Sequence, residues 1–249
     1  MRFGQKLTIL LFAVGAAVAV ALAAPRIPQD PGYHEFADSR EWLGVPNFLD
    51  VVSNAGFLTV GSFGVRLVWK QDRTVNAAER LCYFILSCAI IATALGSAYY
   101  HLAPDNARLF WDRLPLAIVA MAFTSAVISE HVSAETGIVA LVALTAIGAA
   151  SVFYWRSSEL MGHGDLRFYG LVQFLPMLLV PMMLFLFPSQ FRGALNLAWA
   201  VAWYAVAKLC EHFDSQIFSV TGAISGHTLK HLFAALALYF VLRMVQTRR

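Results

Sequence analysis

The sequence predicts an all-α integral membrane protein, in which a bundle of seven transmembrane helices follows one additional N-terminal hydrophobic helix. Hydrophobic residues make up 59% of the 249 residues and charged residues only 13%, whereas soluble domains carry about 25% charged residues. The mean hydropathy is +0.65. The apolar residues fall into eight segments, each close to the roughly 20 residues that cross a bilayer. The polar segments between them are too short to fold as soluble domains.

The first apolar segment, from Leu7 to Ala24, follows two basic residues and permits two interpretations. It is either a signal peptide, cleaved after the small residues around Ala23, or an uncleaved anchor helix. Its apolar run of about 18 residues is long for a signal peptide, and Pro25 would hinder cleavage directly before it. Residues 1–25 are therefore an N-terminal hydrophobic anchor or signal segment, with the anchor favoured.

Residues 26–46 are polar, rich in proline and mixed in charge, which predicts an extracytoplasmic loop. Residues 47–249 then form the seven-helix membrane domain. Asp50, Ser53 and Asn54 share one helix face and are expected to point into the bundle. We expect the seven spans at residues 47–69, 81–100, 114–129, 137–155, 168–187, 193–209 and 227–245.

Basic residues predict the orientation of the bundle. One basic cluster surrounds the loop after the first core span, and a second ends the chain. Basic loops stay in the cytoplasm, so both clusters are expected on that side of the membrane. The predicted order of seven core spans also places the two clusters on the same side. The formal net charge of +3 is too small to indicate a nucleic-acid partner, and the three cysteines have neither metal-binding nor disulfide spacing. The two clusters are Arg66, Lys70, Arg73 and Arg80, and Arg243, Arg248 and Arg249.

Paired polar residues occur at the ends of two spans. Ser97 and His101 lie four residues apart at the end of one span, and His227 and His231 lie four residues apart at the start of the last. Residues at this spacing share a helix face. Asp112 precedes the span that follows His101, so we expect all five side chains at the outer end of the bundle. Ionisable residues at membrane depth are costly, which indicates a functional site.

Three imidazoles, a carboxylate and a hydroxyl at one depth predict a catalytic zinc site. His101, His227 and His231 would bind Zn²⁺ and leave a fourth position for water. Asp112 would accept the water's proton, and Ser97 would hydrogen-bond the water or a developing oxyanion. Each residue alone has a simpler explanation. A single histidine would form an interhelical hydrogen bond, Asp112 would mark the start of a helix, and Ser97 would be a small packing residue. Their joint occurrence favours the metal site.

The other polar residues near span ends have weaker interpretations. His34, His131 and His163 fall in predicted loops, so we expect them to be solvated. Glu211 and Asp214 lie on the outer side with His212, where they either line the site entrance or form a polar helix end.

The set formed by Ser97-x3-His101, Asp112 eleven residues later and His227-x3-His231 resembles the signature of the alkaline ceramidases. These belong to the CREST superfamily of seven-helix membrane hydrolases. Residues 46–54 also resemble the start of that family's first helix. The resemblance covers the seven-span core from about residue 33 onward. It implies that the three histidines bind zinc beside Asp112 and Ser97, and that the reaction cleaves the amide of a sphingolipid, ceramide, to fatty acid and amine.

Two features of the sequence indicate which branch of the superfamily the chain resembles. The eukaryotic enzymes also hold calcium in an acidic segment with a Trp-Cys-Glu run; that run is absent here, and Glu35, Asp38 and Glu41 are spaced differently, so calcium is possible but not favoured. The basic clusters place zinc on the outer side, whereas the related receptors hold it near the cytoplasm. Composition and short loops suit a bacterial inner-membrane protein whose active site faces the periplasm.

The sequence therefore predicts a zinc-dependent hydrolase that takes its lipid amide from the bilayer and has no nucleic-acid partner. Two alternatives stay open. One is a receptor-like or structural seven-helix protein with a non-catalytic zinc, similar to haemolysin-III and adiponectin receptors. The other is a b-type cytochrome with His101 and either His227 or His231 as axial ligands.

Overall fold

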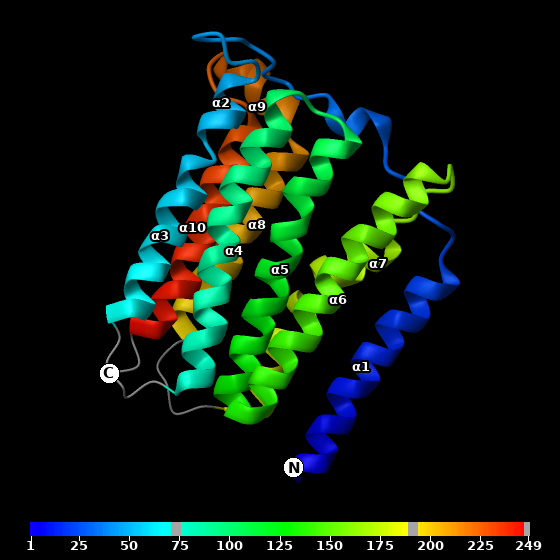
Figure 1. Cartoon of the computed structure of the whole chain (residues 1–249), viewed down its shortest axis with the longest axis vertical. Coiled ribbons are helices and arrows are strands. Elements are labelled where there is room, and N and C mark those ends of the chain that lie inside the picture. Colours follow the sequence, from blue (N-terminus) through cyan, green and yellow to red (C-terminus); the bar gives the residue numbers. More distant parts are fainter. Residues whose placement is uncertain (71–75, 189–193, 247–249) are drawn as a thin grey trace. The chain divides into compact units, whose positions relative to one another are not determined.

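A computed structural model describes residues 1–70, 76–188 and 194–246. Helices make up almost all of this part of the chain and no strand occurs in it, which confirms the all-α prediction (Figure 1). The elements are α1 (Phe3–Ala23), the 3₁₀ helix η1 (Pro31–His34), α2 (Phe48–Val52), α3 (Ala55–Lys70), α4 (Ala77–Leu102), α5 (Asn106–His131), α6 (Ala134–Leu160), α7 (Arg167–Leu186), α8 (Ala194–His212), α9 (Asp214–Thr221) and α10 (Gly226–Gln246).

Six helical segments in the described residues are long and apolar enough to cross a membrane. They are α1, α2 together with α3, α4, α5, α6 and α7. The chain therefore has the helices of a multi-pass membrane protein. The predicted spans at 193–209 and 227–245 correspond to α8 and α10, which are 19 and 21 residues long but are not among the six.

Three predicted boundaries were wrong. Helix α5 begins at Asn106 rather than at Leu114, because Asp105 caps it: its Oδ1 accepts the backbone N–H of Arg108 at 2.7 Å. Asp112 consequently lies within the second turn of α5 and not before the helix. The predicted loop 215–226 contains helix α9, and the first core span is interrupted by a turn between α2 and α3.

The described residues divide into two compact units. Unit 1 comprises residues 1–30, 76–86 and 116–188, and unit 2 comprises residues 31–70, 87–115 and 194–246. In unit 1, helix α1 packs on α7. Arg167 pairs with Asp165 at 2.7 Å and donates to the carbonyl of Ala24 at 2.6 Å, which satisfies a helix-end carbonyl that has no partner within α1.

Unit 2 holds every residue predicted for the zinc site. Helices α3 and α10 run parallel, since a Cβ at Gly56 would meet Ala235 and one at Gly64 would meet Leu242. Helix α8 runs antiparallel to α10, and their rings stack at Trp203 and Phe233 (Figure 1). The close approaches at the two glycines bring the α10 histidines level with the start of α3.

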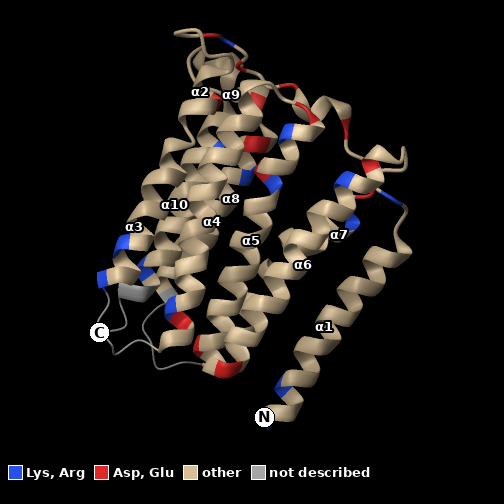
Figure 2. Cartoon of the chain, viewed as in Figure 1, with Lys and Arg blue, Asp and Glu red and all other residues tan. Residues whose placement is uncertain are grey.

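Three basic residues of unit 2 lie towards the C-terminal ends of α3 and α10, away from the α10 histidines (Figure 2). They are Arg66 and Lys70 on α3 and Arg243 on α10. Other basic residues of unit 2, among them Lys208 and Lys230, lie on the histidine side. The remaining members of the two clusters in this region, Arg73, Arg248 and Arg249, lie outside the described residues, as does most of the turn expected after the 168–187 span.

Candidate metal centre

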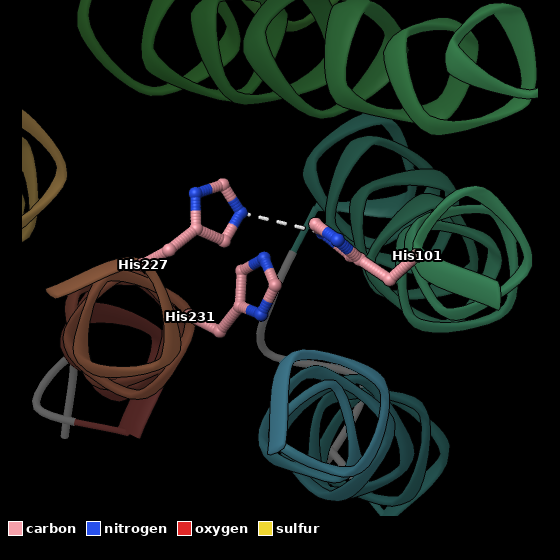
Figure 3. A group of neighbouring side chains, drawn as sticks. All are labelled: His101, His227 and His231. Atoms are coloured by element: carbon pink, nitrogen blue, oxygen red, sulfur yellow. Dashed lines mark hydrogen bonds between the residues drawn. The ribbon is translucent and has the colours of Figure 1, made fainter. Parts of the chain in front are cut away.

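Three histidines from two helices converge in unit 2. His101 lies in the last turn of α4, and His227 and His231 lie in the first turns of α10 (Figure 3). One ring nitrogen of each lies within 4.8 Å of the others, and the side chains are only 1%, 6% and 3% exposed. Within the described residues, no other three or more His, Cys, Asp or Glu side chains meet in this way. The predicted ligand set therefore comes together, and it could hold a metal ion.

The spacing of the imidazoles fits shared coordination. The Nε2 atoms of His101 and His227 lie 3.3 Å apart, which is long for a nitrogen hydrogen bond of about 2.9–3.0 Å. Two imidazoles bound tetrahedrally to one zinc at about 2.0–2.1 Å would have nitrogens about 3.3–3.4 Å apart. Neutral imidazole also binds copper, iron and nickel. The donor set thus fits a divalent transition metal, of which zinc is one.

Ser53 fixes the tautomer of His231. Its Oγ donates to the carbonyl of Asp50 at 3.1 Å and lies 2.8 Å from Nδ1 of His231. Because the hydroxyl has one proton, and that proton goes to Asp50, Oγ accepts from the Nδ1–H of His231. Nε2 of His231 then carries the lone pair and points toward the other two rings (Figure 3). This partner is the kind that orients a metal-binding histidine.

Asp50 joins α2 to the start of α10. Its buried Oδ1 accepts from the hydroxyl of Thr228 at 2.6 Å. Ser225 caps α10 by accepting the backbone N–H of Thr228 at 3.0 Å. These bonds hold the first turn of α10, which carries His227. Asp50, Ser53 and Asn54 are all buried, so their predicted interior placement is confirmed.

Ser97 and Asp112 lie together on α4 and α5. Both are buried, and the two side chains lie close enough to interact. Gly96 makes this possible, because a Cβ there would collide with the carbonyl of Trp111. The two helix backbones touch one residue before each functional side chain. The catalytic roles of Ser97 and Asp112 stay predictions.

Replacing Gly96 by alanine should separate these two side chains. The added methyl would press on the Trp111 backbone, and overpacking of this kind costs about 1–3 kcal/mol. We expect a lower unfolding temperature and a large fall in any activity that depends on Asp112. Gly170→Ala is the matched control, because nothing lies within 4 Å of a Cβ at that helical position. Equal stability of the two variants would contradict the close approach.

A charged network lies beside the triad. Lys230, on α10 between the two histidines, donates to Glu211 of α8 at 3.1 Å, and Lys208 pairs with the other oxygen of Glu211. Lys230 also interacts electrostatically with Asp112. Glu211 was predicted to line an entrance or end a polar helix; it connects α8 to the metal-binding segment of α10.

A segment from the N-terminal loop covers two of the histidines. The ring of Phe36 lies 4.6 Å from that of His101 and 4.4 Å from that of His227, measured between centroids. The segment is tied down at Ala37, whose N–H donates to Asp214 at 3.0 Å, and at Arg40. Sequence reasoning missed this role, since neither an isolated aromatic residue nor an Asp in a loop gives a periodic signal.

Two of the three loop histidines are not solvated, contrary to prediction. His34 contacts Tyr100 Oη at 2.9 Å and Asn106 Oδ1 at 3.0 Å, so both of its ring nitrogens have partners. His131 is nearly buried, with Nδ1 2.6 Å from the carbonyl of Phe187. His34 ends the short helix η1 and His131 ends α5, so both lie in packed structure rather than in open loops. His163 is exposed as predicted.

The carboxylates considered for calcium do not form a cluster with one another. Asp38 is buried and paired with Arg40 at 2.7 Å, whereas Glu35 and Glu41 are exposed. The hydrogen bond from Arg40 holds the pKa of Asp38 below its usual value of 3.8. A lowered pKa adds stability above the usual value and loses it as pH falls through the lowered one. The pair therefore holds this segment at any pH above about 4.

No family model matches the chain, and no curated protein matches it.

Proposed function

We propose that the protein is a zinc-dependent amide hydrolase that cleaves an N-acyl membrane lipid of the ceramide type to fatty acid and amine. The observation that carries the proposal is the convergence of three buried imidazoles, with nitrogens at coordination spacing, in the same compact unit as the buried Asp112 and Ser97. A hydrolytic zinc site needs three protein ligands, a position for water and a nearby base.

The side chains divide the reaction between them. A divalent ion held by the histidines would polarise the amide carbonyl and activate water. Asp112 takes the proton that the attacking water loses as its oxygen bonds to the carbonyl carbon. Asp112 then gives this proton to the amide nitrogen as the C–N bond breaks, which releases the amine and leaves the fatty acid. Ser97 would hydrogen-bond the attacking water or the developing oxyanion.

Burial favours this chemistry. Water exclusion strengthens each fixed charge and dipole around the reacting carbonyl. Lys230 adds a cation that interacts electrostatically with Asp112.

The test is a hydrolysis assay on purified protein in phospholipid nanodiscs. N-acylsphingosine and other amide lipids are offered, and released fatty acid and amine are quantified by mass spectrometry. We expect release that a chelator abolishes and zinc restores. Absence of release from every amide lipid, in protein that contains bound metal, would contradict the proposal.

The proposed membrane arrangement has eight spans, with α8 and α10 included. The basic ends of α3 and α10 face the cytoplasm, and the triad faces the periplasm of a bacterial inner membrane. The support is the separation of Arg66, Lys70 and Arg243 from the histidines within unit 2 (Figure 2).

Cysteine labelling should reveal this orientation. In a background without the three native cysteines, Asn106→Cys at the start of α5 should react with an impermeant thiol reagent applied to intact spheroplasts. Gln71→Cys should react only after the membrane is permeabilised. The reverse pattern would place the site at the cytoplasmic face, as in the related receptors.

A non-catalytic metal site is the second candidate, and one observation favours it. The triad is buried and Phe36 lies over two of its rings, as in a closed structural site. Replacement of Asp112 separates the two functions. The b-type cytochrome stays an alternative, and a purified protein without a Soret band would exclude it.

A further inference from the structure

We infer that Asp214 is a positioning residue that fastens a cover over the metal centre, and that residues 31–46, the cover segment, seal His101 and His227 from water through Phe36. This inference concerns access to the site and holds whatever reaction the site performs.

Both oxygens of Asp214 are used, and each holds a different part of the site. Oδ1 accepts the backbone N–H of His227 at 2.7 Å, and Oδ2 accepts the backbone N–H of Ala37 at 3.0 Å. The first bond fixes the turn that carries a metal ligand, where the positive end of the α10 dipole favours a carboxylate. The second fixes the residue next to Phe36. The Asp214 side chain thus fixes His227 and the cover segment relative to each other.

Gly226 allows Asp214 to reach this position. A Cβ at Gly226 would lie 2.7 Å from the Cα of Asp214 and would collide with the carbonyl of Cys210. The end of α8 and the start of α9 can therefore press against the first residue of α10. This contact brings the Asp214 carboxylate to the N–H of His227.

Phe36 provides the cover itself. Its ring lies edge-on or tilted to His101 and His227, with centroids 4.6 and 4.4 Å away, and within 5.9 Å of Tyr100. An aromatic ring at these distances removes water from the two imidazole faces and adds favourable ring contacts. The two histidines are 1% and 6% exposed.

Arg40 attaches the cover segment at a second point. It pairs with Asp38, donates to the carbonyl of Ala223 at 2.6 Å and lies over the ring of Phe218 at 5.0 Å. The cover segment is therefore attached to the α9–α10 region at two points directly after Phe36, at Ala37 and at Arg40. Because Asp38 and Arg40 neutralise each other, the attachment costs no unpaired buried charge.

The test measures access directly. Full-length protein in nanodiscs is followed for loss of bound zinc to EDTA, and for carbethoxylation of His101 and His227 by diethylpyrocarbonate with EDTA present, read by peptide mass spectrometry. We expect Phe36→Ala to accelerate both processes at least about tenfold. Exposed His163 should react at the same rate in every variant and serves as the internal reference. Wild-type rates in Phe36→Ala would overturn the inference.

Asp214 is tested through its dependence on Phe36. Asp214→Ala should accelerate both processes as Phe36→Ala does, and Asp214→Asn, which keeps one acceptor oxygen, should fall between Asp214→Ala and the wild type. The double variant should label no faster than Phe36→Ala alone, because both changes remove one cover. Trp42→Ala and Glu41→Gln are the controls within the same segment. Multiplied effects in the double variant, or equal effects in the controls, would overturn the coupling. The labelling readout needs no amide hydrolysis, so an inactive enzyme leaves it intact.

Discussion

Alanine at His227 or at His231 is expected to abolish amide hydrolysis and to remove the bound metal. Either change leaves two imidazoles, and catalytic zinc sites use three protein ligands. The measurements are product release and metal content on the same purified sample.

His163→Ala is the control for these variants. His163 is exposed, and its Nδ1 contacts only the carbonyl of Met161 among the described groups. It should keep wild-type activity and metal. Activity that persists in His231→Ala would move the reacting centre elsewhere.

Asparagine at Asp112 is expected to keep the metal and lose about 10²–10⁴-fold in kcat, the usual contribution of a positioned general base. The amide retains the size of the carboxylate, so the packing of α4 on α5 at Gly96 and Trp111 should survive. The loss should appear in kcat more than in KM, because proton transfer occurs in the transition state.

Ser97→Ala gives the matched comparison. It removes the hydroxyl proposed to hydrogen-bond the water or the developing oxyanion, and should lower kcat by about 10–10³-fold, at or below the value of one oxyanion donor. An Asp112→Asn variant that loses its metal would make Asp112 a ligand. A variant that keeps both metal and full rate would favour the non-catalytic metal site.

The ligand set was predictable because each part of it obeys helical periodicity. His227 and His231 share a face at i and i+4, and His101 ends a span that must return beside α10. Asp50, Ser53 and Asn54 were placed in the interior by the same spacing, and all three are buried. Their polarity in an apolar span was the signal.

The surroundings of the triad could not be predicted, because they depend on contacts distant in sequence. Ser53 meets His231 across 178 positions, and Ala37 meets Asp214 across 177. Neither pair leaves a local pattern. The start of α5 was missed for a different reason: an Asp before a helix, such as Asp105, gives the same local signal as an Asp in a turn.

Metal content per chain tests the central claim most directly. Protein purified without added metal is analysed by elemental mass spectrometry, beside a His101→Ala/His227→Ala double variant and the His163→Ala control. The account predicts close to one zinc per chain in the wild type and the control, and none in the double variant. A wild type without transition metal that still hydrolyses its lipid, or a double variant with its zinc intact, would contradict it.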